Sequence, residues 1–171
     1  MRYASLICIL ITQWYIGEKT IREHRISAAA IIIQDKKTLL VRYNDRHGRS
    51  YLVGPGGGVH SDEESMTQAL NREVKEETGL DTNPVKLLFV EEFLSSQNRH
   101  VKIWFLCNII GGTVEKTQGA IEEGITEVRW YGRDELTNEV VYPTVLLEES
   151  WDSFSATNFQ AKYIGFGIAD F

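Results

Sequence analysis

The chain has 171 residues, of which 43% are hydrophobic and 25% are charged, and these proportions are typical of one soluble globular domain with a sizeable core. Its formal net charge of −6 at pH 7 argues against broad binding to nucleic acid or to anionic membranes, because their phosphate groups would be repelled. A small phosphorylated substrate stays compatible with this charge, since a bound metal ion would offset it locally.

The N-terminal segment contains a short apolar run over residues 4–11, preceded by Arg2. A signal peptide has a similar start, but residues 13–16 (Gln-Trp-Tyr-Ile) offer no small-residue cleavage site. The run is also too short to cross a bilayer. An added strand on the domain and an upstream translation start both stay open. We therefore treat residues 1–20 as an apolar extension of unknown role and residues 21–171 as one domain.

Two strand-like segments, residues 28–33 and 38–42, precede a glycine-rich loop over residues 54–58 (Gly-Pro-Gly-Gly-Gly). A backbone without Cβ atoms lets a ligand approach closely. Tyr51 or Trp104 is a candidate for stacking on a nucleobase, with core packing as the alternative. Arginine side chains before the loop are candidates for binding phosphate bidentately, with simple surface charge as the alternative. These arginines are Arg42, Arg46 and Arg49.

A helix is predicted after the glycine loop. Ser65 and Gln68 have the spacing of a capping box, which starts the helix at Met66, and Gly79 ends it. On a helical wheel, three carboxylates fall within or beside the apolar sector, so they point toward the protein, and desolvated carboxylates need a metal ion or a strong donor. A solvated acidic face is the alternative. The carboxylates are those of Glu73, Glu76 and Glu77, the apolar residues are Met66, Ala69, Leu70 and Val74, and the opposite side carries Thr67, Gln68, Asn71, Arg72, Lys75 and Thr78.

Strand patterns dominate the rest of the chain. Residues 85–90 form an apolar run, residues 101–109 alternate with a period of two, and residues 128–131 form a short strand. Residues 116–124 are predicted to form a loop, and residues 141–154 a C-terminal helix. Strands interleaved with two helices indicate a mixed sheet between helices.

The glycine loop and the helix together carry a family resemblance. Gly58, Glu64 and the run from Arg72 to Leu80 (REVKEETGL) resemble the complete Nudix box, with no departure from the pattern of that family. The likeness extends from about Arg25 to about Thr144. It implies a Nudix-type α/β/α sandwich with a mixed β-sheet, and hydrolysis of the phosphoanhydride bond in a nucleoside diphosphate linked to another group. It also implies Mg²⁺ or Mn²⁺ as a cofactor, which polarises the phosphate and activates water.

The resemblance implies roles for individual residues of the box. Glu73 and Glu77 are the expected metal ligands, Glu76 is a ligand or a base, and the carbonyl of Gly57 or Gly58 completes the coordination. Such carbonyl and carboxylate oxygens are the ligands that hard divalent cations prefer.

Three further acids and one arginine are expected to act beside the metal ligands, either by positioning them or as a general base. Arg72 and Glu64 are expected to hold the metal-binding carboxylates in position, with an ordinary surface ion pair as the alternative. Members of the family often carry the general base on a loop outside the box. Glu122 and Glu123 occupy such a position, with a solvated loop charge as the alternative for each.

Two classes of function stay open from the sequence. The first is an active metal-dependent hydrolase, acting on a nucleotide sugar such as ADP-ribose, on a non-standard (d)NTP or on a dinucleoside polyphosphate. The second is a catalytically silent Nudix-like domain that senses a nucleotide, whose usual mark would be a lost acid in the box. A small nucleotide is the expected partner, without stable nucleic-acid or membrane binding, and a homodimer stays open. Cys8 and Cys107 are too few for a disulfide framework or a zinc site, so we expect a cytoplasmic protein with Cys107 buried.

Overall fold

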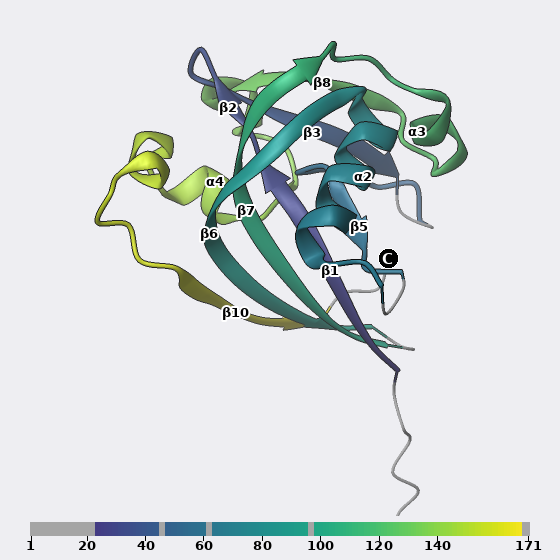
Figure 1. The fold of residues 1–171 in the computed structure, drawn as a ribbon, viewed down its shortest axis with the longest axis horizontal. Coiled ribbons are helices and arrows are strands. Elements are labelled where there is room, and N and C mark those ends of the chain that lie inside the picture. Colours follow the sequence, from purple (N-terminus) through teal and green to yellow (C-terminus); the bar gives the residue numbers. More distant parts are fainter. Residues whose placement is uncertain (1–22, 45–46, 61–62, 96–97, 169–171) are drawn as a thin grey trace, which may run out of the picture.

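The computed structural model describes residues 23–44, 47–60, 63–95 and 98–168, so the apolar extension and Arg46 lie outside the described residues. Two β-sheets and several short helices make up this part of the chain (Figure 1). The first sheet has the order β10 (Lys162–Ile168), β6 (Leu80–Leu94), β7 (Asn98–Gly112), β1 (Glu23–Ile31) and β5 (Gly56–Gly58). The second has the order β2 (Ile33–Gln34), β3 (Lys37–Asn44), β4 (Ser50–Val53) and β9 (Val141–Tyr142), and β8 (Glu127–Gly132) also pairs with β3.

Both sheets mix parallel and antiparallel pairs. Strand β1 runs parallel to β7 and antiparallel to β5, while β6 runs antiparallel to β7 and parallel to β10. In the second sheet β3 pairs antiparallel with β4, and β4 pairs parallel with β9. The predicted mixed sheet is therefore confirmed, although it is divided into two.

Strand β1 separates two hydrophobic cores because successive side chains of a strand point to opposite faces. Ala29 and Ile31 belong to one core, and Ala28 and Ala30 belong to the other. Helix α2 (Met66–Thr78) covers the second core with apolar side chains. Helix α4 (Val145–Glu148) and the 3₁₀ turn η3 (Trp151–Ser155) cover the first. This layering of helix, sheet and helix is the predicted α/β/α arrangement (Figure 1).

Helix α2 has the predicted ends. The Ser65 hydroxyl accepts from the Gln68 N–H at 3.3 Å, and the Gln68 side chain accepts from the Ser65 N–H at 2.8 Å, which completes the capping box. Gly79 ends the helix with φ = 76°, a left-handed conformation that favours glycine. The wheel was wrong for Thr78, which is buried and whose hydroxyl donates to the Val74 carbonyl at 2.6 Å. It was also wrong for Met66, which is exposed at the first turn of the helix.

Two predicted elements need correction. The segment 116–124 is not all loop, because Gln118–Glu122 form helix α3, and the Thr117 hydroxyl caps it by accepting from the Ala120 N–H at 3.0 Å. The C-terminal helix over 141–154 is wrong as one element. Its start is strand β9, which pairs with β4, and the extended backbone of Glu149 (φ −99°, ψ 153°) separates α4 from η3. The 3₁₀ turn η2 (Arg133–Leu136) follows β8.

Candidate active site

Three carboxylates meet where helix α2 and helix α3 approach strand β5. Glu73 and Glu76 come from α2, and Glu123 comes from the end of α3. Each offers one oxygen, and these three oxygens lie within 4.8 Å of one another. Glu73 is 3% exposed, whereas Glu76 and Glu123 are open to solvent. Several carboxylate oxygens around one point suit a hard divalent cation, so these residues fit a metal site. The sequence analysis expected Glu73 and Glu76 there, but it named Glu77 as the further ligand and Glu123 only as a candidate base.

The glycine loop makes room for this cluster. A Cβ atom at Gly57 would collide with the carboxylate of Glu73, so only glycine lets that carboxylate lie against β5. The carbonyl of Gly58 accepts from the Arg72 guanidinium at 3.2 Å. Of the two carbonyls proposed as metal ligands, that of Gly58 thus has a partner within the protein.

Glu77 lies beside the cluster and is almost fully buried, with 1% exposure. One of its oxygens accepts from the Gly56 N–H at 2.9 Å, and the other accepts from the Tyr43 hydroxyl at 3.0 Å. Burial raises the pKa of Glu77 to about 8. The same Tyr43 hydroxyl lies 3.4 Å from a Glu123 oxygen, so it bridges the two acids. Tyr43 is a site residue that the sequence analysis missed.

Arg72 links several acids of the site. Its guanidinium lies 2.8 Å from Glu64, 2.9 Å from Glu73 and 3.2 Å from Glu76. The Glu64 carboxylate also accepts from the His60 N–H at 3.2 Å, and the pKa of Glu64 falls below its usual value chiefly because of the Arg72 hydrogen bond. Arg72 and Glu64 therefore lie where the sequence analysis expected them, next to the α2 carboxylates.

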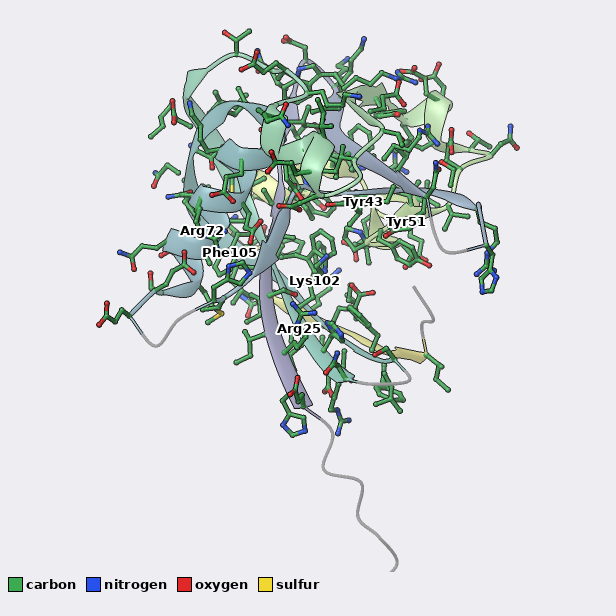
Figure 2. All side chains as sticks on the ribbon, turned by 90° about the vertical axis from the view of Figure 1, so that its right-hand side faces the viewer. Arg25, Tyr43, Tyr51, Arg72, Lys102 and Phe105 are labelled. Atoms are coloured by element: carbon green, nitrogen blue, oxygen red, sulfur yellow. The ribbon has the colours of Figure 1, made fainter. Side chains whose placement is uncertain are left out.

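A cavity of about 440 Å³ opens between the two sheets beside the glycine strand. Tyr43 and Tyr51 line one side and stack at 5.7 Å between ring centroids, and Tyr142 meets Tyr51 edge-on at 5.9 Å. Arg25 and Lys102 line it from the first sheet (Figure 2). Tyr51, a sequence candidate for base stacking, thus lines the cavity, and the sequence analysis did not name Lys102 or Arg25 as lining residues.

Three of the remaining candidates lie outside both the cavity lining and the three-carboxylate cluster. Arg42 does not line the cavity; its guanidinium binds Glu139 at 2.9 and 3.0 Å and Glu127 at 2.9 Å. Arg49 is exposed and also lies outside the cavity lining. Glu122 is exposed and accepts from Gln118 at 3.0 Å, away from the three-carboxylate cluster. Trp104 lines the cavity but belongs to the core, with 0% exposure.

The fold and the acids on α2 define the class of this protein. A family model described as NUDIX domain matches residues 23–148, and the chain belongs to this family. A Danio rerio protein named 8-oxo-dGDP phosphatase NUDT18 is 36% identical over 110 residues, which cover 63% of this chain and 32% of that protein. The Homo sapiens protein of the same name is 34% identical over 108 residues, covering 63% and 32%. The chain therefore spans about a third of the length of these curated relatives.

Solved structures share the fold. The Escherichia coli ORF135 protein superposes with a TM-score of 0.64 at 22% identity, covering 81% of this chain and 96% of that chain. Within the described residues, no helix combines the length and the apolar character that a membrane span needs.

Proposed function

We propose that this chain is a divalent-metal-dependent hydrolase that cleaves the phosphoanhydride bond of a nucleoside diphosphate derivative. The observation that carries this proposal is the convergence of the Glu73, Glu76 and Glu123 oxygens within 4.8 Å, beside the glycine strand that lines the cavity. Three acids at this spacing repel one another, and a cation between them removes that repulsion. The intact set of acids favours this function over a silent nucleotide-sensing domain.

The acids would hold Mg²⁺ or Mn²⁺, which when bound supplies Lewis-acid polarisation of the phosphate and a more acidic water. Arg72 orients Glu73 and Glu76 through its two ion pairs at 2.9 and 3.2 Å. Gly57 leaves the space into which the Glu73 carboxylate projects.

Glu123 is our choice for the group that accepts a proton from the attacking water. It faces Glu73 and Glu76, it is open to solvent, and its carboxylate lies 3.4 Å from the Tyr43 hydroxyl. Glu76 is the second choice, because Arg72 and the cluster hold it in the same place. Glu122 is set aside because its carboxylate accepts from Gln118 instead.

The substrate that we propose to test first is an oxidised guanine nucleoside diphosphate. The Danio rerio and Homo sapiens relatives, at 36% and 34% identity, are both named 8-oxo-dGDP phosphatase. The cavity has the size of a small-molecule site, and its tyrosine pair offers a flat surface for a base.

The test is a substrate panel assayed with Mg²⁺ or Mn²⁺ and again after chelation. The panel contains 8-oxo-dGDP, ADP-ribose, a UDP-sugar, canonical and oxidised dNTPs and a dinucleoside polyphosphate, and product is read as released phosphate or nucleotide. Hydrolysis that needs the metal supports the proposal. No hydrolysis of any member, or hydrolysis that survives exhaustive chelation, overturns it. Glu123→Gln should lose most activity, whereas the neighbouring Glu122→Gln is the matched control and should keep it.

A further inference from the structure

Neighbouring residues with a small side chain or none lie on the face of the first sheet that lines the cavity. Ser27 on β1 lies opposite Gly58 on β5 and, on its other side, opposite Lys102 on β7. All three line the cavity. A ligand can therefore approach the sheet closely over Ser27 and Gly58, and the lysine stands at one end of that row.

The Lys102 ammonium is held within the cavity rather than in bulk solvent. It lies over the Trp104 ring at 4.9 Å from the centroid, and the residue is partly buried. Burial lowers the pKa of this ammonium, while the charges of Glu91, Glu77 and Glu73 act to raise it. The charges of two acids of helix α2 therefore act on Lys102, although the lysine belongs to strand β7.

The carboxylates nearest to Lys102 already have other partners. Glu91 lies opposite Lys102 in the β6–β7 ladder, but it accepts from the Trp104 indole N–H at 3.1 Å. Glu92 binds the Arg99 guanidinium at 2.9 Å. Among the described residues, no carboxylate oxygen lies within 4.0 Å of the Lys102 ammonium. A partly buried ammonium with three donors and no ion-pair partner gains from a ligand that supplies an anion.

We propose that Lys102 binds a phosphate oxygen of the substrate, as an anion subsite separate from the three-carboxylate cluster. The inference rests on the proposed function, because it assigns one residue of the same site to the phosphate that is being transferred or released. Phosphate is favoured over a neutral carbonyl as the partner, since a charge-assisted hydrogen bond is the stronger compensation for a desolvated cation.

Arg25 adds a second cation to the cavity wall that carries Lys102, where Glu91 and Glu92 also lie. It lies opposite His100 in the β1–β7 ladder, and both line the cavity. The charges of Arg25 and Lys102 both lower the pKa of His100, after the larger effect of burial. The positive charges of one cavity wall therefore lie together, in a protein whose net charge is −6. Because Arg25 is exposed, we expect a smaller contribution from it than from Lys102.

The experiment compares Lys102→Met with Lys37→Met, a control that removes the same charge from an exposed position outside the cavity. The probe is imidodiphosphate, whose bridging nitrogen resists hydrolysis, and its binding is measured by calorimetry with Mg²⁺ present. Binding of guanosine, which has no phosphate, is measured in parallel. Loss of one charge-assisted bond predicts a 10- to 100-fold weaker imidodiphosphate affinity for Lys102→Met, at roughly 1.4 kcal/mol per tenfold. Guanosine binding should not change.

Kinetics with the best panel substrate give the second readout. We expect KM to rise about tenfold or more in Lys102→Met and kcat to change less, because the lysine binds phosphate in the ground state as well. Lys102→Arg should restore part of the affinity, since it keeps the charge. Should Lys102→Met fail to fold by circular dichroism, Lys102→Gln takes its place.

The outcomes separate this inference from the proposed function. Unchanged imidodiphosphate affinity in the Lys102 variants overturns the inference even if the wild-type enzyme hydrolyses its substrate. Equal losses for guanosine and imidodiphosphate also overturn it, because they indicate a packing role over Trp104. Lys102-dependent binding of imidodiphosphate without hydrolysis of any panel member would keep the anion subsite and reject the hydrolase.

Discussion

Two clusters of arginine and glutamate side chains differ in their balance of charge. In the site cluster, Arg72 contacts three carboxylates, and a fourth lies within 4.8 Å of two of these. In the second-sheet network, two arginines share three carboxylates, and Arg42 alone makes five hydrogen bonds. The site cluster consists of Glu64, Arg72, Glu73, Glu76 and Glu123, and the second-sheet network of Arg42, Glu127, Arg129, Glu135 and Glu139.

The pKa shifts of Glu127, Glu139 and Glu123 agree with this difference in charge balance. Hydrogen bonds from Tyr131, Arg42 and Arg129 lower the pKa of Glu127 to about 2, and Arg42 also lowers the pKa of Glu139. Burial and the neighbouring acids instead raise the pKa of Glu123. The acids of the second-sheet network have arginine partners that stabilise the fold, whereas the acids of the site cluster outnumber their cationic partner and are those we propose as metal ligands. The same residue types therefore serve stability in one place and chemistry in the other.

The largest expected effect is a difference in kcat between a variant of the site cluster and a variant of the second-sheet network. Glu73→Gln should lower kcat by about 100-fold or more, because it removes a metal-directed charge without changing shape. Glu127→Gln is the matched control from the second-sheet network and should keep kcat within a few-fold. Steady-state kinetics on folded protein checks both. Near-normal turnover of Glu73→Gln would move the site away from the cluster.

The next effect concerns metal binding and needs no substrate. Mg²⁺ at about 100 times its dissociation constant should stabilise the wild-type protein by about 2.7 kcal/mol, since it binds only the folded state. Glu73→Gln should lose most of this gain, and Glu127→Gln should keep it. Thermal unfolding with and without Mg²⁺ measures the shift in Tm. Equal shifts for both variants would mean that the cation binds outside the site cluster.

A third prediction concerns Arg42, which the sequence made a candidate for phosphate binding. Arg42→Met should destabilise the fold by about 1–3 kcal/mol, because Glu127 and Glu139 lose a partly buried partner. The KM of the remaining folded enzyme should change little, since Arg42 does not line the cavity. Urea unfolding and KM are the two measurements. A large rise in KM with unchanged stability would restore the phosphate-binding role.

The sequence predicted helix α2 well because its signals are local. The capping box at Ser65 and the stop at Gly79 need no knowledge of the rest of the chain, and both are confirmed. The 3.6-residue period is confirmed for Ala69, Leu70 and Val74. The burial of Glu73 and Glu77 follows from the same period. Glu76 lies at the edge of the apolar sector, and the structure leaves it exposed. Helix α3 was missed because five residues are too few to carry a period.

The cavity could not be predicted because it depends on long-range packing. Lys102 falls on the polar side of the alternating pattern at 101–109, which suggested a solvent-facing strand surface. Trp104 on the same side is fully buried, so the second sheet and its helices cover that face. Trp104, two residues from Lys102 and on the same side of the strand, was the signal in the sequence that this face is not exposed to solvent. Similarly, the partners of Arg42 come from residues 127 and 139, far along the chain.

The smallest expected effect has opposite signs in the two clusters. In the metal-free protein, Glu123→Gln should stabilise the fold by less than about 1 kcal/mol, because it relieves repulsion among exposed carboxylates. Glu127→Gln should destabilise it by a similar amount, because it weakens bonds from Arg42, Arg129 and Tyr131.

Acid titration sharpens this last prediction. The pKa of Glu127 is lowered from 4.5 to about 2, so its stabilising effect is fully present above about pH 4.5 and is lost as the pH falls toward 2. Urea unfolding of the chelated wild-type protein at pH 4.5 and at pH 3 should therefore show stability falling between these two values, and Glu127→Gln should flatten part of the fall. Glu122→Gln, next to Glu123 but outside the cluster, serves as the control for Glu123→Gln and should leave stability unchanged. If Glu123→Gln and Glu127→Gln shift the free energy of unfolding in the same direction, the two clusters do not differ in charge balance, and surplus negative charge is not what marks the site.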